Sequence, residues 1–308
     1  MNQETAISTH KLTKTFGSRI AVNNLNLEIK QGEIFSLLGT NGAGKTTTIK
    51  MLCCLLQPES GSAAIMGYDI KSHPLKIKGL IGVSPQETAI AEHLTTRENL
   101  LLMGGISGLK KVEAIQRAAT LMDLLELENR KDQAIKLSGG LQRRLSIGMA
   151  LMSDPKILFL DEPTLGLDPH ARKSVWNYIE KLKKEKTILL TTHYLEEADA
   201  IADRIAIMDN GNIIESGSSG ELKSRYTFRR TLIISGDHLT NELTHELGKK
   251  GLEAVIMNDQ LEISGTDPDI YAVIDLLRQY KVKITGIQFK EPSLDDVFLH
   301  LTNKELLK

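Results

Sequence analysis

The sequence predicts an α/β protein in which residues 1–225 form a largely parallel sheet covered by helices on both faces. A small α+β domain is predicted to follow in residues 230–308. Three observations predict this organisation: short apolar runs alternate with helical patterns, a glycine-rich loop joins one such run to a helix, and the C-terminal part has the element order of a small sandwich. A chain of 308 residues suits about two domains, although one large α/β domain would also fit.

Four short apolar runs predict buried strands, and four stretches with apolar residues at helical spacing predict helices. Continuous apolar runs are typical of strands buried on both faces of a parallel sheet. Apolar and polar residues alternate over residues 20–29, which predicts antiparallel strands before that sheet. The predicted strands are Ile34–Leu38, Ile157–Leu160, Thr187–Thr192 and Ile205–Met208, and the predicted helices are Lys45–Leu56, Glu113–Leu125, Leu141–Met152 and Arg172–Lys183.

A turn-rich segment at residues 216–220, Ser-Gly-Ser-Ser-Gly, separates this part from a more compact pattern. The order that follows is βαββαβ, which predicts a split-βαβ sandwich. On folding, a domain of this size buries only about 60% of the surface that its unfolded chain exposes. We therefore expect it to pack against another part of a protein. Its predicted strands are Thr231–Ser235, Ala254–Met257, Leu261–Ser264 and Ile284–Phe289, and its predicted helices are Thr240–Lys249 and Asp269–Tyr280.

The composition argues against several classes of protein. With 38 basic and 39 acidic side chains the formal net charge is −1, so no nucleic-acid partner is expected. The two cysteines, Cys53 and Cys54, are adjacent, which argues against a disulfide framework and favours a reducing compartment. The longest apolar runs are far shorter than the ~20 residues of a membrane span, and the N-terminal residues lack a secretory pattern. We therefore expect a chain that does not cross a membrane by itself.

The segment Gly39–Thr46 fits the phosphate-binding pattern G-x-x-x-x-G-K-[ST]. It follows an apolar strand and opens an apolar helix, the context that this motif requires. Its backbone N–H groups and the helix N-terminus can bind phosphate oxygens, Lys45 can reach the β- and γ-phosphates, and the Thr46 hydroxyl suits Mg²⁺. The residues expected to bind the nucleotide are Gly39, Thr40, Asn41, Gly42, Ala43, Gly44, Lys45, Thr46 and Thr47.

Two acids, Asp161 and Glu162, follow the predicted strand Ile157–Leu160. A strand that ends there would place Asp161 at the carboxyl edge of the sheet, beside the phosphate loop. One acid is enough to support Mg²⁺, and the second can orient and deprotonate an attacking water. We therefore assign Asp161 to the metal and Glu162 to the general base.

Ser138, Gly139 and Gly140 precede that strand and open a helix, which predicts a second anion site without a lysine. With the motifs above, this segment resembles the signature loop of the nucleotide-binding subunit of ATP-binding cassette (ABC) transporters. The resemblance covers about residues 4–225. It implies a P-loop NTPase of the ABC ATPase type, whose mixed sheet is joined by an antiparallel β subdomain and a helical subdomain.

The resemblance also implies roles for single residues. Phe16 resembles the aromatic residue that stacks on adenine, and Gln86 resembles the Gln-loop residue that touches Mg²⁺ and couples to the membrane partner. Asp168 resembles the residue of the loop that crosses the dimer interface. His193 resembles the switch histidine that contacts the γ-phosphate and so joins Lys45 and Glu162 as a catalytic residue. One departure is Leu141, which stands where the signature commonly has Gln.

The implied function is ATP hydrolysis with Mg²⁺ that powers a separate integral membrane permease from its cytoplasmic face. Two such subunits would pair head to tail, each ATP lying between one phosphate loop and the partner's signature loop. The intact set of motifs suits a homodimer, and a heterodimer stays open. The segment Glu291–Phe298 resembles the close of ABC-2 type exporter ATPases. The alternative is a soluble ABC ATPase acting on ribosomes or DNA, which is less favoured because one cassette and no heptad run are found.

The role of residues 230–308 stays open between a regulatory ligand sensor and a dimerisation or stability element. Leu294, Val297, Phe298 and Leu301 have helical spacing near the end of the chain. We expect them to form a helix packed on its own domain rather than a face that binds a partner.

Overall fold

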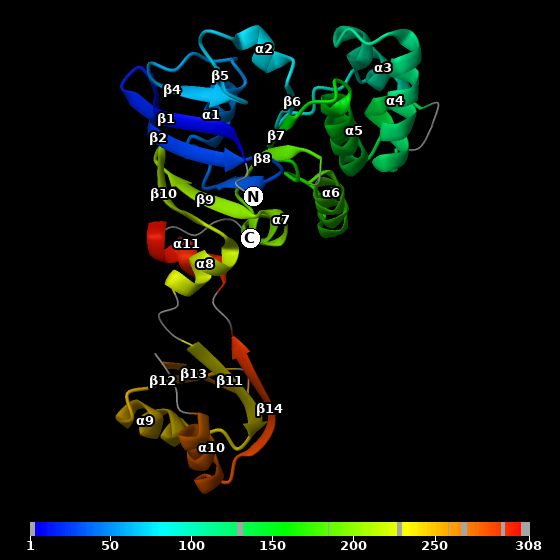
Figure 1. Ribbon diagram of the computed structural model, residues 1–308. Coiled ribbons are helices and arrows are strands. Elements are labelled where there is room, and N and C mark those ends of the chain that lie inside the picture. Colours follow the sequence, from blue (N-terminus) through cyan, green and yellow to red (C-terminus); the bar gives the residue numbers. More distant parts are fainter. Residues whose placement is uncertain are drawn as a thin grey trace. The chain divides into compact units, whose positions relative to one another are not determined.

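The computed structural model describes residues 4–127, 132–183, 185–226, 230–257, 259–265, 270–290 and 293–302 (Figure 1). The chain divides into two compact units. One comprises the described residues of Met1–Ser219 and of Leu301–Lys308, and the other those of Gly220–His300. That residues 1–225 and 230–308 are separate domains stays a prediction about independent folding. Asp269, Glu291 and Pro292 lie outside the described residues.

A six-stranded sheet in the order β10-β9-β3-β8-β7-β6 forms the centre of the first unit. Neighbouring strands from β9 to β6 are parallel, and β10 is antiparallel to β9. Every residue of β3, β7 and β8 is buried, as their continuous apolar runs predict. The strands are β3 (Ile34–Leu38), β6 (Ile81–Ser84), β7 (Ile157–Asp161), β8 (Thr187–Thr192), β9 (Arg204–Asp209) and β10 (Asn212–Gly217).

A second sheet, formed by strands before and after β3, packs on the first, in the order β2-β1-β4-β5 and with antiparallel pairing. The alternation over residues 20–29 correctly predicts β2. Strands β4 and β5 and the short helix α2 after them are not apparent from periodicity, because their apolar positions are few. The elements are β1 (Thr5–Phe16), β2 (Arg19–Lys30), β4 (Ser60–Ile65), β5 (Tyr68–Asp69) and α2 (Pro74–Lys78).

Both faces of the central sheet are covered, and β7 shows this directly. Its residues Ile157 and Phe159 belong to a core shared with the antiparallel sheet and α1 (Lys45–Leu52). Its residues Leu158 and Leu160 belong to a second core shared with the helices on the other face. Side chains of a strand alternate between faces, so one strand supplies two cores.

Three helices that contact one another form a helical part of the first unit, seen together in Figure 1: α3 (Thr96–Ile106), α4 (Lys111–Leu124) and α5 (Gly139–Leu151). A short 3₁₀ turn at Ala134–Lys136 leads into α5. The chain then adds α6 (Pro169–Leu182) and α7 (Leu195–Ile201) around β8.

Several helix limits differ from the predicted ones, and three of them have a local cause at the helix end. Helix α5 begins at Gly139, before Leu141, because the Ser138 hydroxyl accepts the Leu141 N–H at 3.4 Å. Helix α6 begins at Pro169 because the Asp168 carboxylate accepts the N–H groups of His170 and Ala171, both at 3.0 Å. Helix α1 ends at Leu52 rather than at Leu56, and Cys54 there has a left-handed φ of 56°.

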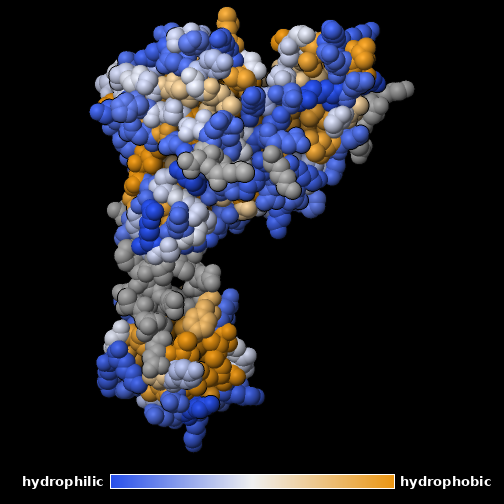
Figure 2. Space-filling view, viewed as in Figure 1, coloured by the Kyte–Doolittle hydropathy of each residue, from blue (hydrophilic) through white to orange (hydrophobic). Residues whose placement is uncertain are grey.

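The second unit has the split-βαβ arrangement that the sequence predicts. Its antiparallel sheet has the order β12-β13-β11-β14, and apolar residues of the strands pack with those of α9 and α10. Figure 2 shows apolar surface on this unit, whose strands expose Val255, Met257, Ile287 and Phe289. The elements are α8 (Ser219–Arg225), β11 (Arg230–Asp237), α9 (Asn241–Lys249), β12 (Glu253–Met257), β13 (Gln260–Gly265), α10 (Ile270–Gln279), β14 (Lys283–Lys290) and α11 (Leu294–Thr302).

Helix α11 forms over the apolar spacing near the end of the chain. Leu294, Val297 and Phe298 are buried, and Leu301 is half-buried. The apolar face of α11 is therefore buried, and its packing on its own domain stays a prediction.

Candidate active site

The phosphate loop connects the buried strand β3 to helix α1. Gly42 and Gly44 have left-handed backbones, with φ of 81° and 109°. A Cβ atom on Gly44 would lie 2.3 Å from the carbonyl oxygen of Ala21, so only glycine fits this close approach. The loop can thus turn its N–H groups toward a common centre at the N-terminus of α1, which favours anions.

Lys45 turns back over this loop and is only 5% exposed. Its ammonium group donates to the carbonyl oxygens of Gly39 and Thr40 at 2.7 and 3.2 Å. The same Nζ lies 3.1 Å from Oε1 of Glu162. The structure therefore brings two of the predicted catalytic residues, Lys45 and Glu162, into one ion pair. They lie 117 positions apart in the sequence.

Asp161 ends strand β7 and faces the start of α1. Its Oδ1 accepts hydrogen bonds from the Thr46 hydroxyl at 3.1 Å and from the Thr191 hydroxyl at 2.5 Å. Asp161 and Thr46 thus present oxygen donors side by side. A carboxylate and a hydroxyl are donors that suit Mg²⁺, which keeps waters and phosphate oxygens as its other ligands.

Glu162 has a left-handed backbone, with φ of 50°, unusual for a residue other than glycine. Its N–H donates to the carbonyl and hydroxyl oxygens of Thr191 at 3.1 and 3.0 Å, which holds this conformation. Its Oε2 accepts a hydrogen bond from Nδ1 of His193 at 2.7 Å. The backbone strain therefore points the carboxylate toward Lys45 and His193.

Charge compensates the burial of Glu162, which is 4% exposed. Burial by itself raises the pKa of Glu162, but the hydrogen bond from His193 and the positive charge of Lys45 outweigh it. The pKa of Glu162 therefore lies below its ordinary value, and the side chain is an ionised carboxylate at neutral pH.

A pocket of about 500 Å³ opens over this cluster. Phe16, which is 52% exposed, lies at its rim, and Gln86 lines it from the loop after β6. The pocket thus combines an exposed aromatic ring, the phosphate loop and the carboxylate of Glu162. The residues that line it are Phe16, Arg19, Ala21, Asn41, Gly42, Ala43, Gly44, Lys45, Thr46, Thr47, Gln86 and Glu162.

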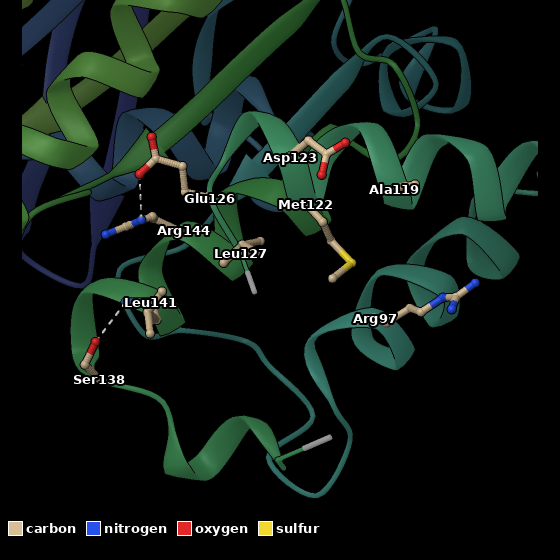
Figure 3. A pocket seen from close by; sticks show the side chains of 9 residues that line it. All are labelled: Arg97, Ala119, Met122, Asp123, Glu126, Leu127, Ser138, Leu141 and Arg144. Carbon is tan, nitrogen blue, oxygen red and sulfur yellow. Dashed lines mark hydrogen bonds and ion pairs between the residues drawn. The ribbon is translucent and has the colours of Figure 1, made fainter. Parts of the chain in front are cut away.

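The signature residues do not line that pocket. Ser138 lines a different pocket of about 860 Å³ in the helical part, together with Leu141 and Arg144 (Figure 3). Gly139 and Gly140 open α5 beside it. Asp168 is exposed and caps α6, and hydrogen bonds from the N–H groups of Ala171 and His170 lower its pKa. Within one chain, the signature and the phosphate loop are therefore parts of separate surfaces.

Sequence reasoning missed three residues at or near the site. Thr191 bridges the two acids, but a threonine inside a strand carries no sequence signal. Arg19 donates to the carbonyl oxygen of Gly42 at 3.1 Å from the start of β2, where nothing in the pattern singles it out. Glu197 belongs to the first turn of α7, where acids usually serve the helix dipole in solvent.

Glu197 is in fact fully buried. Its Oε1 accepts hydrogen bonds from the Thr164 hydroxyl at 2.9 Å and the Trp176 indole N–H at 3.1 Å. Burial raises the pKa of Glu197 to about 7, against hydrogen bonds from Thr192, Thr164 and Trp176 that lower it. Through these hydrogen bonds, Glu197 connects α7 to Trp176 of α6 and to Thr164 in the segment after Glu162.

Comparison with known proteins gives a consistent result. A family model described as ABC transporter matches residues 22–165. The chain is 39% identical over 305 residues to the daunorubicin/doxorubicin resistance ATP-binding protein of Streptomyces peucetius, covering 96% of this chain and 92% of that protein. It is 35% identical over 310 residues to the Nod factor export ATP-binding protein I of Sinorhizobium fredii, covering 98% and 88% of the two chains.

Solved structures agree. The dimeric structure of a post-hydrolysis state of an ATP-binding cassette bound to ADP and Pi matches with a TM-score of 0.63 and 28% identity, over 69% of this chain and 98% of that chain. The structure of an ATP binding subunit of an ABC transporter matches with a TM-score of 0.64 and 29% identity, over 72% and 93%. The fold and the site define a P-loop ATPase. The chain belongs to the ABC transporter family, as one of its ATP-hydrolysing subunits.

In the part of the chain that the structure describes, each helix is too short or too polar to span a lipid bilayer.

The raised pKa of Glu197 predicts a specific pH dependence of stability. The folded chain keeps this proton up to about pH 7, whereas the unfolded chain loses it near 4.5. Stability is therefore lost as the pH rises through this window and is constant above it. Glu197→Gln keeps the Oε1 acceptor and removes the titration. From pH 5 to pH 8 the variant should gain up to roughly 3 kcal/mol of unfolding free energy relative to the parent.

Urea unfolding followed by fluorescence measures this difference, because Trp176 is the single tryptophan and contacts Glu197. Glu196→Gln is the matched control, since Glu196 is the exposed neighbour in the same turn. Parallel pH curves for the parent and Glu197→Gln would show that the buried carboxyl does not titrate in this range.

Proposed function

We propose that two copies of this chain bind two MgATP molecules between them, head to tail, and that hydrolysis at this shared site drives a separate export permease. One observation carries the proposal: the buried carboxylate of Glu162 is held between Lys45 and His193, at the edge of a pocket built on a phosphate loop. An ionised, oriented carboxylate at that place suits the activation of water for attack on a γ-phosphate.

Each residue at the edge of the sheet has a part in this proposal. Glu162 accepts the proton of the attacking water, and Lys45 neutralises the β- and γ-phosphates. His193 orients Glu162 through Nδ1, which leaves Nε2 for the γ-phosphate. The backbone N–H groups from Gly39 to Thr47 hold the phosphates, and Phe16 stacks on the adenine.

Thr46, Asp161 and Gln86 are the residues that would hold Mg²⁺. The adjacent oxygens of Thr46 and Asp161 and the place of Gln86 in the pocket wall support this assignment. When bound, the ion supplies positive charge to the oxygens of the transferring phosphoryl group.

The separate pocket of Ser138 supports a site completed by a second chain. Ser138, Gly139 and Gly140 would bind the γ-phosphate held by the partner, and Asp168 would face the partner across the interface. The matching cassette with ADP and Pi is dimeric. Leu141 offers no polar side chain and its N–H donates to Ser138, but the O–H of Ser138 remains as a donor at the start of α5.

Export and a place on the cytoplasmic face of a membrane are proposed from the relatives. The two relatives named above carry resistance and Nod factor export in their names. Nothing in those names favours a soluble ABC ATPase that acts on ribosomes or DNA, and the net charge of −1 also argues against a nucleic-acid partner. We therefore propose an integral membrane permease as the partner, supplied by a separate chain.

Glu162→Gln should lower the turnover number for ATP roughly 10²- to 10⁴-fold and leave ATP affinity nearly unchanged, because the amide keeps the shape but cannot accept a proton. Steady-state phosphate release and binding of a fluorescent ATP analogue measure the two quantities. Lys45→Ala is the contrasting variant, since it should weaken ATP binding itself. Hydrolysis at the parent rate by Glu162→Gln would refute the general base.

The permease can be tested by purifying the tagged chain from detergent-solubilised membranes of its own host. We expect a polytopic membrane protein in stoichiometric amount, retained by the Glu162→Gln variant as well. Ribosomal or DNA-repair proteins in its place would refute the export proposal and favour the soluble alternative.

A further inference from the structure

Helix α5 carries a buried arginine whose contacts the proposed mechanism does not use. Arg143 lies five positions after Ser138 and is 4% exposed. Its Nη1 donates to the carbonyl oxygen of Pro85 at 2.7 Å, and its Nη2 donates to that of Gln86 at 2.7 Å. One guanidinium group thus holds two consecutive carbonyl groups of the Gln loop.

The end of β6 is attached to α5 by further contacts. The hydroxyl groups of Ser84 and Ser146 lie 2.8 Å apart and are buried. A Cβ atom on Gly82 would lie 2.3 Å from the carbonyl oxygen of Ala150, so the strand and helix backbones nearly touch. Arg143 and Ser146 are three residues apart and lie on one face of the helix. One face of α5 therefore contacts both β6 and the Gln loop that follows it.

The charge of Arg143 is compensated at this place. Burial lowers the pKa of Arg143, and the negative charges of Asp161 and Glu162 act in the opposite direction. A planar guanidinium group can donate hydrogen bonds to two carbonyl oxygens at once in a fixed geometry. A lysine ammonium group on a flexible chain fixes that geometry less well. The site therefore uses the specific geometry of arginine.

We propose that Arg143 is a positioning residue that couples the signature helix to Gln86. Helix α5 runs from Gly139 to Leu151 with Ser138 as its N-cap, so Ser138 and Arg143 move as one body. The backbone of Gln86 is fixed to this helix, while its side chain lines the pocket of Lys45 and Thr46. A displacement of Ser138 toward a partner's nucleotide would therefore move Gln86 relative to the phosphate loop. This inference rests on the proposed function of Ser138 and Gln86.

The next residue provides a matched control. Arg144 donates to the carbonyl oxygen of Leu125 and to the Tyr178 hydroxyl, both at 3.4 Å, and lies 3.8 Å from Glu126. Figure 3 shows Arg144 paired with Glu126 in the pocket of the helical part, which Gln86 does not line. Loss of Arg144 removes a cation from the same helix without touching the Gln loop.

Amide hydrogen exchange of the full chain, with and without MgATP, tests the attachment. Arg143→Met should raise exchange in residues 84–90 about tenfold and reduce the change that MgATP causes there, because two charge-assisted hydrogen bonds are lost. Arg143→Lys should give an intermediate effect, and Arg144→Met none in this segment. Exchange in residues 84–90 of Arg143→Met equal to that of the parent would overturn the proposal.

A double-mutant cycle with Gln86→Ala tests the coupling. Arg143→Met should lower turnover about tenfold or more in the parent and less than about threefold in the Gln86→Ala background, because both changes remove the same function. Losses that multiply would mean that Arg143 acts independently of Gln86 and would overturn the coupling. If Gln86→Ala alone retains full turnover, the proposed function of Gln86 fails, and hydrogen exchange alone decides whether Arg143 holds the loop.

Discussion

The buried ion cluster of Lys45, Glu162 and His193 is the constraint on which the rest of the first unit depends. None of these three residues is more than 6% exposed, so the charges of Lys45 and Glu162 must be compensated, and the ring nitrogens of His193 hydrogen-bonded, inside the protein. Glu162 does this for both neighbours at once, through contacts of 3.1 and 2.7 Å. Its left-handed backbone, the glycines of the phosphate loop and the parallel order of β3, β8 and β7 are all needed to bring the three groups together.

The same arrangement separates the two parts of the proposed site. The carboxyl edge of the central sheet supplies the phosphate loop, the two acids and the histidine, whereas the signature loop opens a helix whose N-terminus faces another pocket. Helix α5 nevertheless reaches back to the Gln loop through Arg143. The phosphate loop and the signature segment are thus separate surfaces, and α5 connects the signature segment to the Gln loop. This suits the proposed enzyme, which hydrolyses ATP only when a second copy closes over it.

Much of this could be predicted from the sequence, for physical reasons that also set the limit. Strands β3 and β8 have their predicted bounds because continuous apolar runs mark strands buried on both faces. The phosphate loop and the acid pair have local patterns. Thr191 and Arg143 have none, because their roles come from contacts with residues far away in the chain. A helix begins earlier than apolar periodicity predicts where a polar capping residue, such as Asp168, precedes the first apolar position.

The most direct test of the shared site is complementation between two inactive variants. Lys45→Ala damages the phosphate loop and Ser138→Arg damages the signature, so each alone should hydrolyse almost no ATP. After the two are mixed and allowed to exchange subunits, half of the dimers should carry one intact composite site. ATPase activity should then return to about a quarter of the parent value. A mixture no more active than the two separate variants would contradict a site built from two chains.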